Sequence, residues 1–234
     1  MRVVQILQMQ LNTAQREITL KIVYYGPPLS GKTTNLQAVH RLLNAQNCGR
    51  LMSLDTADDR TLFFDVLPMF FKTAANFKLK VKLYTVPGQV MHAATRKLVL
   101  EGADGIAYIA DSQRSEARAN NEFWAGLKNN MRAIHMDPNE IPTVIQFNKR
   151  DLPNVRSDAE IDEIARKGSE LVYRGVAVTG EGVLETLGGL LGQVWDSIDR
   201  KHSIEGLLKL NKQDFLAKLF AGANAPREGL LQAQ

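Results

Sequence analysis

The sequence Gly26-Pro-Pro-Leu-Ser-Gly-Lys-Thr33 directly follows a strand-like run over residues 18–25. It fits the pattern G-x-x-x-x-G-K-[ST], in which backbone amides of a loop and of the following helix face a phosphate group. The lysine adds a positive charge, and the final threonine hydroxyl, that of Thr33, is placed to bind Mg²⁺. We therefore expect a strand, a phosphate loop and a helix here, with nucleotide contacts from Gly26, Leu29, Ser30, Gly31, Lys32, Thr33 and Thr34.

Strand-like and helix-like runs alternate along most of the chain. Short apolar runs, typical of strands, cover residues 18–25, 77–84, 105–110, 143–147 and 172–178. Amphipathic runs, typical of helices, cover residues 32–43, 91–101, 115–136, 158–168 and 183–201. This alternation predicts an α/β fold with a mostly parallel central sheet and helices on both faces. A further strand at residues 50–54 is expected to pair with residues 77–84, and the ligand should lie at the carboxyl ends of the strands.

Two segments extend beyond this core. Residues 1–16 could form an added edge strand or a docked helix. Residues 201–234 contain an apolar arc that predicts an amphipathic helix, followed by a frayed end. That helix could pack on its own domain, fill a groove of a partner or contact a membrane surface peripherally. We therefore expect an N-terminal extension over residues 1–16, an α/β domain over 17–200 and a C-terminal appendage over 201–234.

The composition excludes several classes of protein. Of the 234 residues 44% are hydrophobic, which is ordinary for a folded chain, and the net charge of +4 comes without a dense basic tract, which argues against a nucleic-acid partner. The single cysteine, Cys48, cannot form an internal disulfide, as is typical of a reducing compartment. No apolar run approaches the roughly 20 residues of a spanning helix. These features predict a cytoplasmic protein without a transmembrane segment.

A second motif, Asn148-Lys-Arg-Asp151, follows a strand-like run. It matches N-K-x-D, the pattern that selects guanine: Asp151 can accept hydrogen bonds from the N1–H and the amino group, while the Lys149 stem packs over the base. Adenine offers no such donor pair, so a site of this kind rejects the wrong base by about 10⁴ or more. The amide of Ala177 is placed to donate to guanine O6, with Val178 beside it. A P-loop kinase that phosphorylates a metabolite is a weaker alternative, because no acceptor-binding lid is visible.

A third motif, Thr85-Val-Pro-Gly-Gln89, lies where a nucleotide-hydrolysing switch usually reads D-x-x-G-Q. The Gly88 amide can approach the γ-phosphate, and Gln89 can orient the attacking water. Thr85 replaces the acid that normally holds Mg²⁺ through a water molecule. The motif therefore predicts a sensor of the third phosphate with an altered metal site.

The polar loop upstream of this motif carries further candidates. Thr61 could bind Mg²⁺ and the γ-phosphate, and Arg60 could act as an arginine finger supplied in cis. Asp58 and Asp59 could compensate for the missing acid, although solvated loop charges are the simpler interpretation.

These motifs carry a family resemblance. The segments concerned are residues 21–26, 31–36, 59–65, 83–89, 110–113 and 148–153. Together they resemble the MglA family, the small Ras-like GTPases of bacterial gliding motility and cell polarity, over about residues 17–198. The resemblance is specific, because Thr-Val-Pro-Gly-Gln and Asp-Arg-Thr-Leu-Phe-Phe-Asp are not general GTPase motifs.

The resemblance implies a Ras-like P-loop GTPase that binds GTP, GDP and Mg²⁺ and acts as a switch at a cell pole. It also implies motility or polarity effectors of unknown identity, and a roadblock-domain homodimer like MglB that promotes hydrolysis. By motif position, Arg60 would be the arginine finger and Gln89 the water-positioning residue, both arranged by that partner. Thr85 in place of the acid is what this family shows, so it need not signal an inactive site.

Pro28 departs from the family, whose members usually have glycine at this position. Proline has no N–H and a fixed φ. Either it only stiffens the loop, or its ring crowds the space that Gln89 and Arg60 need, so that GTP binds but is hydrolysed slowly. The first interpretation predicts a slow GTPase under partner control, and the second a GTP-binding scaffold with little or no hydrolysis.

Overall fold

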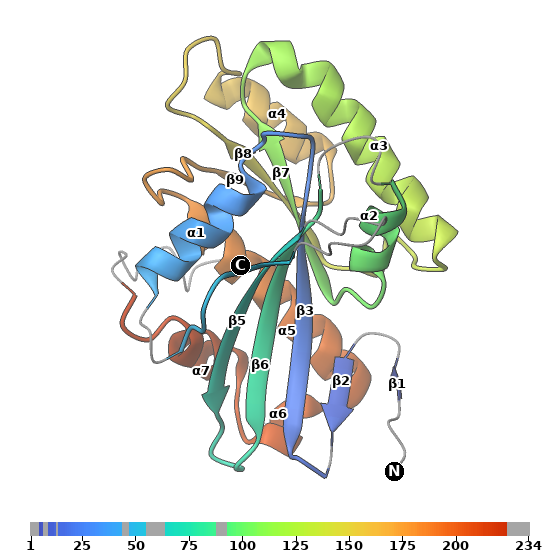
Figure 1. Cartoon of the computed structure of the whole chain (residues 1–234), viewed down its shortest axis with the longest axis vertical. Coiled ribbons are helices and arrows are strands. Elements are labelled where there is room, and N and C mark those ends of the chain that lie inside the picture. Colours follow the sequence, from blue (N-terminus) through green and yellow to red (C-terminus); the bar gives the residue numbers. More distant parts are fainter. Residues whose placement is uncertain are drawn as a thin grey trace.

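The computed structural model describes residues 5–6, 9–12, 14–43, 47–54, 64–87 and 93–223. They form a nine-stranded sheet with the order β4-β5-β6-β3-β7-β8-β9, and β2 pairs with the start of β3 and with β1 (Figure 1). The strands are β1 Gln5–Ile6, β2 Met9–Asn12, β3 Glu17–Tyr25, β4 Met52–Leu54, β5 Phe64–Lys72, β6 Lys78–Thr85, β7 Gly105–Asp111, β8 Thr143–Asn148 and β9 Leu171–Arg174.

Helices cover both faces of the sheet, and they separate two apolar cores. One face carries α1 Lys32–Leu42, α5 Val183–His202, α6 Ile204–Leu208 and α7 Lys212–Leu219. The other carries α2 Ala93–Leu100, the 3-10 turn η2 Arg114–Glu116, α3 Ala117–Ala133 and α4 Asp158–Lys167. Strands β6, β3, β7, β8 and β9 are parallel to one another. The predicted α/β fold, a mostly parallel Ras-like sheet between helices, is confirmed.

The edge of the sheet differs from the prediction. Residues 50–54 were expected to pair with residues 77–84, but β4 pairs antiparallel with β5, a strand that the sequence did not reveal, and β5 pairs with β6. Pro68 lies within β5, where proline normally argues against a strand because it cannot donate to a ladder. It is tolerated here because the pairing with β4 starts only at Val66, so no regular partner strand needs an amide from Pro68, and the Pro68 carbonyl oxygen accepts from the Gly49 amide at 2.8 Å.

The last strand is shorter than the predicted 172–178. β9 ends at Arg174, and the chain then turns back so that Val176 forms a bridge with Glu181. The amide of Ala177 leaves the sheet and donates instead to the Asn148 side chain at 2.9 Å. The residues after Arg174 therefore belong to the candidate site and not to the sheet.

The tail forms two short helices where one was predicted. α6 ends at Leu208, the next residue, Lys209, has a φ of 48°, and the Asn211 side chain caps α7 by accepting from the Asp214 amide at 2.8 Å. The large apolar residues of both helices turn inward, apart from the exposed Leu207, and the ring of Phe215 stacks on that of Trp195 with centroids 4.6 Å apart. The tail thus completes the core beneath α5 and β5. Within the described part of the chain, no helix has both the length and the apolarity to cross a membrane.

Candidate functional site

The phosphate loop connects β3 to α1 and is shaped by two glycines. Gly26 has a φ of 146°, and a Cβ there would lie 2.2 Å from the carbonyl oxygen of Ile109 on β7. Gly31 has a φ of 98°, and a Cβ there would lie 2.2 Å from Nδ2 of Asn148 on β8. L-residues with a side chain rarely adopt such φ values. The loop therefore depends on both glycines to lie against the neighbouring strands.

Lys32 lies beneath this loop. Its side chain is only 7% exposed, and Nζ donates to the carbonyl oxygens of Gly26 at 3.0 Å and of Pro27 at 2.6 Å. Burial, and to a lesser extent the charge of Arg96, lower the pKa of Lys32 to about 7. An anion beside Nζ would favour the charged form.

The first turn of α1 offers further donors to an anion. Among the described residues no acceptor takes the amides of Lys32, Thr33 and Thr34, as is usual for the start of a helix. These amides, the positive end of an 11-residue helix and the Lys32 ammonium suit a phosphate group. The residues present thus fit the phosphates of a nucleotide.

Asn148 joins the phosphate loop to the predicted base-binding loops. Its Nδ2 donates to the carbonyl oxygen of Ser30 at 2.8 Å, and its Oδ1 accepts from the Ala177 amide at 2.9 Å. The adjacent Lys149 forms an ion pair with Asp111 on β7, with 2.6 Å between Nζ and Oδ2. The Ala177 amide, expected to face guanine O6, therefore already has an acceptor within the protein.

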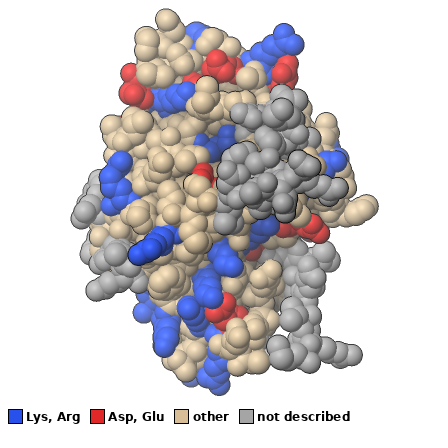
Figure 2. Space-filling model, viewed as in Figure 1, with Lys and Arg blue, Asp and Glu red and all other residues tan. Residues whose placement is uncertain are grey.

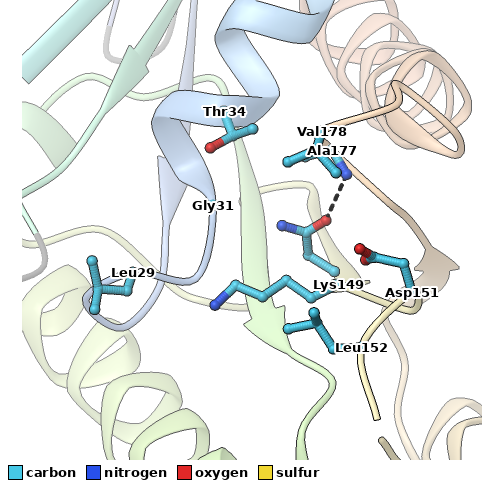
Figure 3. A pocket seen from close by; sticks show the side chains of 9 residues that line it. Leu29, Gly31, Thr34, Lys149, Asp151, Leu152, Ala177 and Val178 are labelled. Atoms are coloured by element: carbon cyan, nitrogen blue, oxygen red, sulfur yellow. Dashed lines mark hydrogen bonds between the residues drawn. The ribbon is translucent and has the colours of Figure 1, made fainter.

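A cavity of about 200 Å³ opens between these segments. Figure 3 shows Lys149 reaching across it toward the phosphate loop, and the Asp151 carboxylate pointing into it. Two lining side chains are exposed at its mouth, Leu29 at 89% and Val178 at 63%. The lining residues are Leu29, Gly31, Thr34, Asn148, Lys149, Asp151, Leu152, Ala177 and Val178. The structure thus brings the phosphate motif and the guanine motif to one cavity, as expected for the carboxyl ends of parallel strands.

A buried carboxylate on β5 was missed by the sequence interpretation. Asp65 accepts a hydrogen bond from the Thr33 hydroxyl at 2.6 Å, from Ser53 at 2.7 Å and from Thr85 at 3.1 Å. Its own amide donates to Oγ1 of Thr85 at 2.9 Å. Thr85 thus occupies the position of the usual acid, and the neighbouring strand supplies a carboxylate next to it.

This carboxylate fits a magnesium site at Thr33. Mg²⁺ prefers oxygen ligands and keeps several waters, so one hydroxyl and a nearby carboxylate can contribute alongside nucleotide phosphates. Within the described residues no group of three or more His, Cys, Asp and Glu side chains could hold a metal by itself. The oxygen set therefore suits an ion that arrives with a nucleotide.

The remaining predicted site residues lie outside the described residues. They are Asp58, Asp59, Arg60, Thr61, Gly88 and Gln89. Their proposed roles stay predictions from sequence.

Comparison with known proteins completes the assignment. No model of a known protein family matches the sequence. The chain is similar to mutual gliding-motility protein MglA of Myxococcus xanthus (strain DK1622), with 48% identity over 177 residues, which cover 76% of this chain and 91% of that protein. This degree of identity extends over most of both chains and agrees with the fold and with the residues around the cavity. The chain therefore belongs to the MglA family of Ras-like small GTPases.

Proposed function

We propose that this protein is a cytoplasmic molecular switch that binds GTP with Mg²⁺ and hydrolyses it slowly. The observation that carries the proposal is the double hydrogen bond of Asn148, which ties the phosphate loop to the base-binding turn around one cavity. A phosphate cradle alone would suit many nucleotides. A carboxylate at Asp151 on the other side of the same cavity favours guanine, because that base alone offers it an N1–H and an amino group.

Each part of the site then has a task. Lys32 and the amides of residues 29–34 hold the phosphates. Thr33 and Thr61 bind magnesium, and Asp65 orients the Thr33 hydroxyl by accepting its hydrogen. Bound magnesium neutralises part of the phosphate charge. Asn148 keeps the two loops in register, and Lys149 packs its stem along the base.

Hydrolysis is assigned to residues of the third motif and of the loop upstream of β5. Gln89 orients the attacking water and Gly88 contacts the γ-phosphate, whereas Arg60 supplies positive charge in the transition state. A roadblock-domain homodimer like MglB arranges these residues and so controls the rate. Similarity to a protein named for gliding motility supports a role in motility. We also propose a role in cell polarity, at a cell pole and through effectors of unknown identity.

A GTP-binding scaffold with little hydrolysis is the second candidate. The observation that favours it is Pro28, a residue with no N–H and a fixed φ within the phosphate loop. This candidate shares the binding site and differs only in the rate of the chemical step.

A change of base preference from guanine to xanthine tests the binding proposal. Asp151→Asn replaces an acceptor carboxylate by an amide, which can donate to the 2-carbonyl of xanthine and accept from its N1–H. We expect the variant to lose GDP affinity by about 10³ or more and to gain affinity for xanthosine diphosphate. Asp137→Asn, an exposed acid on another surface, is the control for charge and should keep GDP preference. Unchanged GDP affinity in Asp151→Asn would refute the assignment of the base-binding site.

A further inference from the structure

One face of the sheet carries a cluster of lysines that are brought together by the pairing of neighbouring strands. On β5 and β6, Lys72 lies opposite Lys78, Phe70 opposite Lys80 and Pro68 opposite Lys82. Directly paired residues project to the same face of a sheet. The charges are therefore gathered by register, although the sequence contains no dense basic tract.

The neighbouring strand extends this cluster. β3 is parallel to β6 and places Lys21 beside Lys82, and Glu17 beside Lys78. We call the five lysines of this surface, Lys21, Lys72, Lys78, Lys80 and Lys82, the basic sheet face. Figure 2 shows Lys and Arg side chains gathered over the lower parts of β5, β6 and β3.

Burial indicates that no helix among the described residues covers this face. Along β6 the residues alternate between buried and partly exposed, and along β3 they alternate at first and are all buried from Ile22 onward. Alternating burial is typical of a sheet with one face in solvent, whereas continuous burial is typical of a sheet that is covered on both faces. The helix layer ends at α2, where Nζ of Lys21 donates to the carbonyl oxygen of Glu101 at 2.8 Å. Among the described residues, no helix therefore covers this face over the amino-terminal half of β3 and its neighbours.

The basic sheet face is only partly neutralised. Glu17, the one carboxylate that the described parts of β3, β5 and β6 turn to this side, forms an ion pair with Lys80 at 2.7 Å. Within the described residues neither Lys72 nor Lys82 has an ion-pair partner. Burial lowers the pKa of Lys21; the charges of Glu101 and Asp104 oppose this shift, and the charge of Lys82 adds to it by a smaller amount. Several positive charges therefore repel one another on one open surface.

We propose that the basic sheet face binds the anionic headgroups of a phospholipid bilayer. Lysines two residues apart on a strand are about 6.7 Å apart, and adjacent strands are about 4.8 Å apart, so the charges are spread over a surface and not focused on one point. An anionic bilayer presents phosphate groups over a wide area without a fixed spacing, and it attracts polybasic surfaces. An acidic peptide would contact only part of this area.

Apolar groups on the same face favour a lipid surface over an acidic protein. The ring of Phe70 lies among the lysines, with Nζ of Lys78 5.6 Å from its centroid, and Pro68 is also partly exposed. Aromatic rings flanked by lysines suit the boundary between headgroups and acyl chains. Most large apolar side chains of the tail helices, Ile204, Leu208, Phe215, Leu216 and Leu219, are by contrast buried in the core on the opposite face of the sheet, and only Leu207 among them is exposed. The sheet, and not the tail, is therefore the membrane-contacting surface.

This orientation keeps the nucleotide cavity accessible. The cavity lies at the carboxyl ends of β3 and β8, whereas the basic sheet face lies along the amino-terminal half of β3. A bound bilayer would leave the cavity and its surroundings free for a protein partner.

Vesicle sedimentation of the full chain tests the proposal. We expect binding to phosphatidylcholine vesicles that contain phosphatidylglycerol, no binding to phosphatidylcholine alone, and a loss of binding as salt increases. Each lysine near an anionic surface contributes about fivefold in affinity. The combined variant Lys72→Gln, Lys78→Gln and Lys82→Gln should therefore bind about a hundredfold more weakly.

A matched variant removes the same number of charges elsewhere. It combines Lys167→Gln, Lys209→Gln and Lys218→Gln, exposed residues on α4 and in the tail. This control should keep vesicle binding, and both variants should keep the melting temperature and GDP affinity of the parent.

Either of two results would overturn the proposal. One is equal binding of the parent to both kinds of vesicle, or binding to neither, which would leave an acidic protein as the partner of this face. The other is an equal loss of binding in the control, which would assign vesicle attachment to overall charge or to the tail.

Discussion

Removal of the Asp65 charge should weaken magnesium binding while the fold stays intact. The change Asp65→Asn keeps the shape of a side chain that accepts hydrogen bonds from Thr33, Ser53 and Thr85. It removes the one negative charge that these hydroxyls share. We expect a weaker dependence of nucleotide binding on Mg²⁺, because the carboxylate attracts the ion and orients its threonine ligand.

The structure gives a magnitude for this effect. Oγ1 of Thr33 lies 2.6 Å from Oδ2 of Asp65. A magnesium–oxygen bond is about 2.1 Å long, so an ion on Thr33 would be within about 4.7 Å of that carboxylate. At this distance a divalent ion and a unit charge attract by about 1.8 kcal/mol even at the dielectric constant of water, which is about twentyfold in affinity. Losses of tenfold to a hundredfold are usual when such outer partners are removed.

The assay is a magnesium titration of the dissociation rate of a fluorescent GDP analogue. The midpoint for Asp65→Asn should move to about twentyfold higher magnesium, while dissociation in excess chelator stays close to that of the parent. Ser53→Ala is the control, because it removes a donor to the same carboxylate but no charge. A midpoint within about twofold of the parent would refute the reasoning and leave magnesium without help from β5.

Three further outcomes are expected. The pKa of Lys32 is lowered to about 7 in the folded protein. Between about pH 7 and 10 this lysine is therefore protonated in the unfolded chain but neutral in the folded one, so the nucleotide-free protein gains stability as pH rises. Binding of GDP at about pH 8 should then be coupled to the uptake of close to one proton by Lys32. A calorimetric heat of GDP binding that does not depend on the buffer would contradict this. Pro28→Gly should leave single-turnover hydrolysis unchanged, alone and with the partner, because Pro28 is exposed and Lys32 bonds to other carbonyls of the loop; a faster variant would support the scaffold. Phe215→Ala should lower the free energy of unfolding in urea by about 3–5 kcal/mol, since the ring is fully buried on Trp195. Leu207→Ala, at a side chain that is 45% exposed, should cost less than about 1 kcal/mol, and equal losses would mean that the tail is not packed as described.

Much of the site could be predicted because its motifs are local. The phosphate loop and the guanine motif each occupy a few consecutive residues after a strand, and parallel pairing brings such loops together. Neither motif, however, reveals that the Asn148 amide bridges Ser30 and Ala177, since these residues are 118 and 29 positions away. That contact depends on the order of the strands in the sheet, which periodicity alone does not give.

Asp65 escaped prediction for a related reason. Its strand contains Pro68 and lacks a clean alternation of apolar and polar residues, so it was not recognised as a strand. Without β5 in place, nothing in the sequence connects Asp65 with Thr33 or Thr85. The tail was predicted as one helix because its apolar residues fall within one arc, although Asn211 interrupts it, whereas the left-handed φ at Lys209 that separates α6 from α7 was not visible in the sequence. The roles of Arg60 and Gln89 remain predictions.

The burial of α7 has a consequence for the order of synthesis. Phe215 and Leu219 belong to the same apolar core as β3 and β5, although they are made about 190 residues after the phosphate loop begins. While the chain is still on the ribosome, the underside of β5 therefore stays uncovered until α7 has emerged. A chain that ends before residue 212 would leave the rings of Phe71 and Trp195 without their contact to Phe215.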